Sequence, residues 1–218
     1  MLSQIELKPF DDPFGTPGDT QSFYDDRAIV DLINHGQFDE AQNVLEFGLG
    51  TGRFAEMLLQ DHLPITARYL AYDLSNTMVN LARQRLTAYK SRVEIFKTPC
   101  KLPVIKPHSV DRFVCNYVFN LMRPEEIKET LNWAKESLSR EGMCTLVSLT
   151  NGAGGLSKML SKAWNGLFKL SPTLVGGCRP IDLEPFLELG GWTILYSNRM
   201  SNFGVTTEVL TCQTNSSI

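Results

Sequence analysis

The fold of this chain is decided by the stretch Val44-Leu45-Glu46-Phe47-Gly48-Leu49-Gly50-Thr51-Gly52. An apolar run over residues 43–47 predicts a strand, and residues 53–60 predict the helix that follows it. The three glycines between them carry no Cβ, so backbone N–H groups near the start of the helix can approach a ligand closely. The stretch therefore predicts a strand, a ligand-binding turn and a helix in one unit.

An acidic residue follows this turn at a spacing that narrows the choice of ligand. Asp73 ends a second apolar run, residues 68–73, and its carboxylate can accept hydrogen bonds from both hydroxyls of a ribose. Nicotinamide and flavin sites use the pattern G-x-G-x-x-G, whose third glycine permits close helix packing. Here Arg53 stands at that third position, and Gly52 comes one residue earlier. The spacing therefore disfavours a nicotinamide oxidoreductase.

Outward from this unit, short apolar runs alternate with amphipathic stretches. The first five runs predict strands over residues 43–47, 68–73, 93–96, 110–118 and 144–149. Such alternation predicts a parallel sheet with helices on both faces. A short helix over 180–189 then precedes strands over 193–198 and 205–212, whose tight link favours an antiparallel pair. We therefore expect an α/β, Rossmann-like fold with a seven-stranded, mostly parallel sheet and a C-terminal antiparallel hairpin.

Length and patterning predict a single domain, because 218 residues suffice to bury one sizeable core. We expect four parts in it: an N-terminal arm and lid helix (1–40), a cofactor-binding core (43–150), a lid insertion (151–179), and a C-terminal helix with the hairpin (180–218). The insertion has a glycine-rich start and an amphipathic run. The apolar face of that run either packs in the core or contacts an apolar acceptor or a membrane surface.

Composition excludes several classes of function. The net charge of −3 and the isoelectric point near 5.7 argue against a broad grip on nucleic acid. The five cysteines show no metal-ligand spacing, and no carboxylates cluster after the fourth expected strand, so we expect no metal. No secretory signal is visible, and no apolar run reaches the roughly 18 residues of a membrane span. We therefore expect a cytoplasmic protein without a stable membrane span.

The run Glu46-x-Gly48-x-Gly50-x-Gly52 resembles motif I of the class I S-adenosylmethionine-dependent methyltransferases. It is most similar to the ubiquinone- and menaquinone-biosynthesis methyltransferases. Later landmarks of the family follow in order within residues 43–149, namely Tyr72-Asp73-Leu74-Ser75, Leu102-Pro103 before residues 110–114, and Glu141-Gly142. The resemblance implies a methyltransferase that binds S-adenosylmethionine and releases S-adenosylhomocysteine.

The resemblance also implies where the parts of the cofactor lie. The cofactor is expected to lie over Gly48, Gly50 and Gly52. Its methionine end is expected near Glu46 and Gly48, and its ribose on Asp73.

The adenine side departs from the pattern of the family, which has Asp and a small residue where this chain has Thr98 and Pro99. Thr98 can still accept one hydrogen bond as a cofactor-binding residue, but Pro99 has no N–H to donate. Adenine recognition is therefore weaker here, or is built differently around Cys100 or Lys101.

Methyl transfer from a sulfonium needs alignment and desolvation more than a catalytic side chain. The fourth expected strand ends near Asn116 and Tyr117, which resemble the region of the family that faces the methyl group. We therefore take Asn116 as a cofactor contact, and both residues as candidate catalytic residues. Tyr117 either orients the acceptor or packs in the core.

Three further residues are candidates for binding the acceptor. Asn120 lies just beyond the fourth expected strand. Tyr24 belongs to Phe23-Tyr24-Asp25, which resembles a segment that closes over the cofactor, so it is either a lid residue or a packing residue. Arg179, at the end of the expected insertion, either pairs with an anionic group of the acceptor or lies at the surface.

We expect methyl transfer to a small-molecule or lipid-like acceptor. The alternative is a catalytically weak or inactive cofactor-binding regulatory or scaffold protein, which Thr98-Pro99 makes conceivable. The sequence leaves open the acceptor atom, the need for a general base and the oligomeric state.

Overall fold

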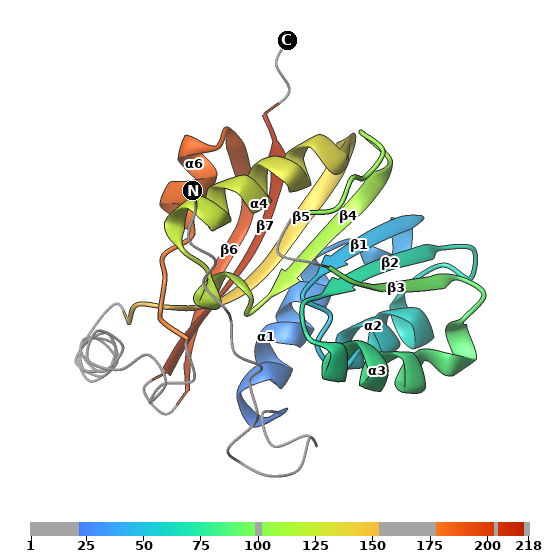
Figure 1. Ribbon diagram of the computed structural model, residues 1–218. Helices are drawn as coiled ribbons and strands as arrows, with labels where there is room; N and C mark the ends of the chain where they lie inside the picture. Colours follow the sequence, from blue (N-terminus) through green and yellow to red (C-terminus); the bar gives the residue numbers. More distant parts are fainter. Residues whose placement is uncertain (1–21, 99–101, 153–177, 203–204, 216–218) are drawn as a thin grey trace, which may run out of the picture.

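The computed structural model describes residues 22–98, 102–152, 178–202 and 205–215. These residues contain a seven-stranded sheet in the order β3-β2-β1-β4-β5-β7-β6 (Figure 1). Its strands are β1 (Asn43–Phe47), β2 (Arg68–Asp73), β3 (Val93–Lys97), β4 (Val110–Asn116), β5 (Leu138–Thr150), β6 (Trp192–Asn202) and β7 (Val205–Thr214).

Strands β1 to β5 run parallel to their neighbours, whereas β7 runs antiparallel to both β5 and β6. The pairing of β6 with β7 extends from Trp192 opposite Thr214 to Asn202 opposite Val205. The expected seven-stranded Rossmann-like sheet with a C-terminal antiparallel hairpin is therefore confirmed. Because β6 runs in the same direction as β5, its carboxyl end lies at the same edge of the sheet as those of the parallel strands. We call this the carboxyl edge.

Helices cover both faces of the sheet (Figure 1). The helices α1 (Ser22–His35), α2 (Arg53–Met57) and α3 (Asn76–Arg85) pack on one face. The helices α4 (Pro124–Ser137) and α6 (Glu184–Leu189) pack on the other. Two local signals place helix starts, since Ser75 caps α3 with its side chain and Pro124 is the first residue of α4.

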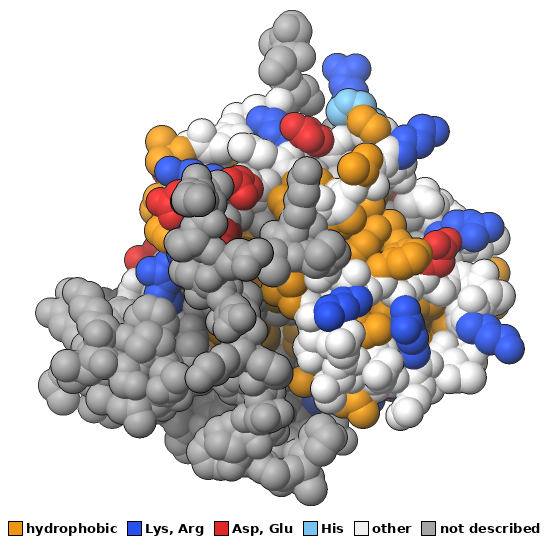
Figure 2. Space-filling view, viewed as in Figure 1, with side chains coloured by type: hydrophobic (Ala, Val, Ile, Leu, Met, Phe, Trp, Pro, Cys, Tyr) orange, Lys and Arg blue, Asp and Glu red, His pale blue; other side chains and the backbone are white. Residues whose placement is uncertain are grey.

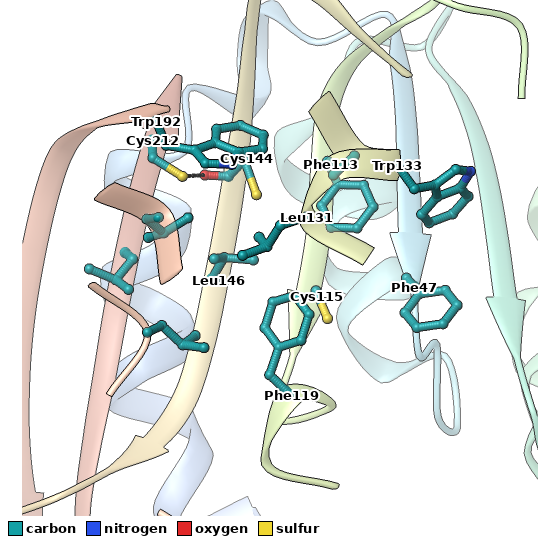
Figure 3. Packing of buried hydrophobic residues seen from close by; sticks show 14 of the residues in the cluster. Phe47, Phe113, Cys115, Phe119, Leu131, Trp133, Cys144, Leu146, Trp192 and Cys212 are labelled. Atoms are coloured by element: carbon teal, nitrogen blue, oxygen red, sulfur yellow. Dashed lines mark hydrogen bonds between the residues drawn. The ribbon is translucent and has the colours of Figure 1, made fainter. Parts of the chain in front are cut away.

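An aromatic cluster on the α4 side fills the core beneath the helix (Figure 3). The Trp133 ring packs edge-on against Phe47 and Phe113, with centroids 5.6 and 5.7 Å away. Its indole N–H donates to the Pro103 carbonyl at 2.8 Å, so the buried polar end of the ring is satisfied. The cluster packs against β1, which leads into the glycine turn, and against its neighbour β4.

At the opposite edge of the sheet, which we call the amino edge, two charged residues of β4 form hydrogen bonds with backbone groups of neighbouring segments. The Asp111 carboxylate accepts hydrogen bonds from the backbone N–H groups of Gln42 and Asn43, at 2.9 to 3.1 Å. The buried Arg112 guanidinium donates to the carbonyls of Gly36 and Gln37, both at 2.7 Å. In open α/β sheets, ligands bind at the carboxyl edge.

Parts of the expected domain plan lie outside the described residues, namely residues 1–21 of the arm and 153–177 of the insertion. In the part of the chain that the structure describes, no helix is long and apolar enough to cross a membrane.

Candidate active site

The glycine turn between β1 and α2 uses a left-handed backbone at each of its three glycines. Their φ angles are 85° at Gly48, 57° at Gly50 and 78° at Gly52, values that L side chains rarely adopt. The backbone N–H groups of Gly48 and Leu49 both donate to the Tyr72 carbonyl, at 2.8 and 3.1 Å. These hydrogen bonds fix the turn to the end of β2.

Each glycine meets different surroundings. A Cβ on Gly48 would lie 2.1 Å from a methyl group of Val118, and one on Gly52 would lie 3.1 Å from Ala82 of α3. A Cβ on Gly50 would meet nothing within 4 Å. Gly48 and Gly52 therefore permit close packing, whereas Gly50 borders open space that can take a ligand.

Asp73, the last residue of β2, holds this turn with its side chain. One carboxylate oxygen accepts from the Gly50 N–H and the other from the Ser75 N–H, both at 2.8 Å. Burial raises the pKa of the Asp73 carboxyl, and these backbone hydrogen bonds oppose the rise. Each carboxylate oxygen accepts more than one hydrogen bond, so Asp73 keeps capacity for the two hydroxyls of a ribose.

Glu46 lies in β1, two residues before Gly48, and is only 1% exposed. Its carboxyl accepts a hydrogen bond from the Tyr69 hydroxyl at 2.9 Å. Burial raises its pKa from 4.5 to about 8, with a smaller upward contribution from the charge of Asp73. The Glu46 carboxyl is therefore mostly neutral at pH 7.

Near Asp73 lie the buried residue Thr98 and two exposed apolar side chains. Thr98 is buried, and its N–H donates to the Asp73 carbonyl at 2.9 Å. Pro99, Cys100 and Lys101 lie outside the described residues. Leu74 and Phe96 are 43% and 44% exposed.

Leu74 follows Asp73 directly, and Phe96 lies in the neighbouring strand β3. Hydrophobic side chains gather on the face of the molecule over the region where Figure 1 shows β1 to β3 (Figure 2). Exposed apolar side chains of this kind, beside the Asp73 carboxylate, suit a flat aromatic ring. Sequence reasoning missed both residues, although an apolar residue between Asp73 and the capping Ser75 was a usable signal.

The end of β4 meets the glycine turn. The side-chain amide of Asn116 is shielded from solvent, and neither Nδ2 nor Oδ1 has a hydrogen-bond partner within the described part of the chain. Tyr117 has a φ of 59°, which is uncommon for a residue with a side chain, and its N–H donates to the Val147 carbonyl at 2.7 Å. The strand therefore turns sharply after Asn116, and Val118 then packs over Gly48.

The structure brings Asn120 and Arg179 together, mostly through backbone atoms. The Asn120 amide donates to the carbonyls of Leu149 and Arg179, at 2.7 and 2.9 Å, and accepts from the Leu149 N–H at 2.9 Å. The Arg179 N–H donates to the Asn120 carbonyl at 3.0 Å, and its guanidinium donates to the Met122 carbonyl at 3.0 Å. Asn120 therefore positions Arg179 at the end of β5.

Asp182 is a further polar residue at this edge that sequence reasoning missed. Its carboxylate accepts from the Thr150 hydroxyl at 2.7 Å and from the Asn151 amide at 3.1 Å. Burial works against ionisation, but these hydrogen bonds outweigh it and lower the pKa of the Asp182 carboxyl. The candidate lid residue Tyr24 lies in α1, but its side chain is outside what the structure describes.

Residues 44–142 match a family model described as a methyltransferase domain. No curated protein matches the chain in sequence.

Solved structures share the fold at low sequence identity. The YcgJ protein from Bacillus subtilis is 11% identical with a TM-score of 0.66, and the match covers 87% of this chain and 99% of YcgJ. Magnesium protoporphyrin IX methyltransferase from Synechocystis PCC 6803, solved with bound SAH, is 16% identical with a TM-score of 0.64, over 89% of this chain and 83% of that one. The [4+2]-cyclase SpnF is also 16% identical, with a TM-score of 0.65 over 86% and 80%.

In its strand order and over residues 44–142 this chain is similar to methyltransferase domains. The likeness to the ubiquinone-type enzymes remains a resemblance of motifs.

Proposed function

We propose that this chain transfers the methyl group of S-adenosylmethionine to a small-molecule or lipid-like acceptor in the cytoplasm. The hydrogen bond between Asp73 and Gly50 is the observation that carries this proposal, because it fixes a carboxylate beside the open space in front of Gly50. A ribose suits such a place, since its two hydroxyls can donate to the carboxylate.

The cofactor side of the proposed site is built from β1, β2 and the residue after β3. The backbone of Gly48, Gly50 and Gly52 lines the cofactor, and Asp73 binds its ribose. Glu46 lies towards its methionine end, and its buried carboxyl can ionise beside a positive charge. Leu74 and Phe96 flank the adenine, with Thr98 accepting a hydrogen bond from it.

The acceptor side is formed by the ends of β4 and β5. Asn116 and Tyr117 face the methyl group, and Asn120 and Arg179 border the acceptor, with Tyr24 as a candidate lid residue. When bound, the sulfonium cofactor would supply an electrophilic methyl group to a nucleophilic atom of the acceptor at this end of the site. The protein's part is to align the two partners and exclude water, and both effects lower the barrier to such a displacement.

The proposed class of acceptor is based on the net charge of the chain and on the sequence of the insertion. A net charge of −3 disfavours nucleic acid as the acceptor. The amphipathic run over residues 156–169 suits an apolar acceptor, but it lies outside the described residues.

The alternative function is cofactor binding with weak or absent turnover. Two observations support this alternative function. Thr98-Pro99 departs from the family pattern, and the [4+2]-cyclase SpnF shows that this fold also carries other chemistry.

Calorimetric titration with S-adenosylmethionine, S-adenosylhomocysteine and NADH, each alone, tests the cofactor. We expect micromolar or tighter binding of the first two and none of NADH. A screen of amines, phenols and fatty acids with methyl-labelled cofactor then tests turnover. Binding without labelled product across the screen would favour the regulatory alternative, and absence of binding would refute the cofactor site.

A further inference from the structure

A small cavity lies at the carboxyl edge of the sheet, between α1 and the hairpin of β6 and β7. Its volume is about 30 Å³, which is enough for about two water molecules. Its walls are partly apolar and partly polar, and they include Ala28, Met200, Val205, Arg27, Asn202 and Thr207. Strands β4 and β5 separate it from the glycine turn. A cavity lined in this way suits one small polar group attached to an apolar body.

Arg27 supplies the charge of this cavity. Asp31 stands four residues further along α1, a spacing at which opposite charges can pair on a helix. The Asp31 carboxylate instead accepts hydrogen bonds from the Tyr196 hydroxyl, at 2.9 and 3.0 Å, and from the Asn198 amide, at 3.1 Å. Within the part of the chain that the structure describes, Arg27 forms no ion pair. Its guanidinium is therefore available to a ligand.

Thr207 adds a hydroxyl beside this charge. It lies in β7 two residues before Val209, so it shares the face that packs against α1, and it is 6% exposed. On the opposite face, the Thr206 hydroxyl is hydrogen-bonded to that of Ser201 at 2.8 Å, whereas the Thr207 hydroxyl has no such partner among the described residues. A guanidinium and a free hydroxyl can both donate, and one positive charge matches a carboxylate.

The register of the sheet gives the distance from this cavity to the end of β4. Asn116 pairs with Val147 of β5, which pairs with Val209 of β7, so the three residues lie in one row. Thr207 is two residues nearer the carboxyl edge than this row. Two strand spacings and two residues place it about 12 Å from Asn116 along the sheet. Leu149 of β5 pairs with Thr207 and is half-buried, so an apolar surface lies between the two positions.

We infer that the cavity binds a carboxylate of the methyl acceptor, with the Arg27 guanidinium as its counter-charge and the Thr207 hydroxyl as a second donor. This inference rests on the proposed function, which places the methyl group near Asn116 and Tyr117. The acceptor is then an amphipathic carboxylic acid. Its nucleophilic atom lies about 12 Å from the carboxylate, so the carboxylate itself is not methylated.

Calorimetric titration of the full chain, saturated with S-adenosylhomocysteine, tests the carboxylate. The probes are ω-amino acids from γ-aminobutyrate to ω-aminododecanoate, each compared with the alkylamine of the same chain length. We expect the amino acids to bind at least tenfold tighter than the amines, because they add a charge-assisted hydrogen bond to Arg27. Affinity should be highest near ω-aminooctanoate, whose two ends can reach the cavity and the end of β4 together.

Three variants separate the contacts. Arg27→Met keeps an apolar stem without the charge, and it should weaken the amino acids by about tenfold to a hundredfold while leaving the alkylamines unchanged. Thr207→Val removes the hydroxyl at nearly constant shape and should weaken the amino acids by about fivefold. Arg68→Met is the matched control, because Arg68 is exposed at the start of β2, at the amino edge. It changes the net charge equally and should bind every probe like the wild type.

Four outcomes would count against these assignments. Equal affinities of amino acids and amines in the wild type, or equal losses for both in Arg27→Met, would overturn the carboxylate site while leaving the proposed function intact. Binding that depends on Arg27 but not on chain length would assign the cavity to a free anion and overturn its role in holding the acceptor. A wild-type protein that does not bind S-adenosylhomocysteine would instead refute the proposed function.

Discussion

The Asp73 carboxylate accepts a hydrogen bond from the Gly50 N–H at 2.8 Å, although 23 residues separate them in sequence. The bond joins the end of β2 to the middle of the glycine turn. The carboxylate proposed to bind the ribose therefore also fixes the backbone of the turn.

Replacing Gly50 with Ala should weaken cofactor binding at least tenfold. The new Cβ enters the open space in front of the turn, and the φ of 57° becomes strained by about 1–2 kcal/mol. Gly191→Ala is a matched control, because Gly191 has a φ of 70° at the amino edge and its Cβ would meet only the flexible end of Lys135. Calorimetry and thermal unfolding of both variants should show similar destabilisation but a binding defect in Gly50→Ala alone.

Replacing Asp73 with Ala should lower the affinity for S-adenosylmethionine by about a hundredfold or more, because two charge-assisted hydrogen bonds to the ribose are lost. Asp111→Ala removes a carboxylate that also binds two backbone N–H groups, but at the amino edge. It should destabilise the fold and leave affinity unchanged. Equal affinities of the two variants for S-adenosylmethionine would show that Asp73 does not bind the ribose.

The buried Glu46 carboxyl should make the stability of the folded protein fall as pH rises. Its pKa is about 8 when folded and 4.5 ordinarily, so between these values the folded state binds one proton more than the unfolded state. The free energy of unfolding should therefore decrease from pH 4.5 to about 8 and level off above. Urea denaturation of wild type and Glu46→Gln at pH 5, 7 and 9 should show a gap that grows with pH in favour of the variant.

Tyr69→Phe serves as the control for this pH dependence. The Tyr69 hydroxyl bonds the Glu46 carboxyl and lowers its pKa, so its removal should extend the fall in stability above pH 8. A difference between wild type and Glu46→Gln that does not vary with pH would show that Glu46 is ionised throughout.

The fold and the turn could be predicted from sequence because their signals are local. Apolar periodicity marks a strand, and the spacing of Gly48, Gly50 and Gly52 marks the turn without knowledge of any partner. Asp73 was found in the same way, since it ends a recognisable apolar run.

The roles of individual polar residues could not be predicted so well, because they depend on contacts distant in sequence. Glu46 bonds Tyr69 across two strands, and Asp182 bonds Thr150 across 32 residues. Nothing local distinguishes Asn120, which bonds backbone groups of β5, from Asn116, which does not. These contacts depend on how the strands pair and on where the chain returns after the insertion. They can therefore be seen only in the three-dimensional structure.

The pair of Arg199 and Glu208 fixes the end of the sheet next to the acceptor side. Glu208 of β7 is fully buried, and the Arg199 guanidinium of β6 donates to its carboxylate at 2.7 Å. Burial raises the pKa of Glu208, and the nearby positive charge opposes this rise. Removing the arginine therefore leaves a buried carboxylate without its counter-charge.

Arg199→Met should destabilise the protein by roughly 1–3 kcal/mol at pH 8, less than a fully buried pair would lose, because the Arg199 side chain is 34% exposed to screening solvent. The loss should be smaller at pH 5, because without Arg199 the pKa of Glu208 rises further and the carboxyl takes up a proton. Arg199→Met combined with Glu208→Leu should recover most of the stability, since no charge is then left in the core. Urea denaturation at both pH values measures these differences, and equal stability of the single and double variants would show that Glu208 is solvated without its partner.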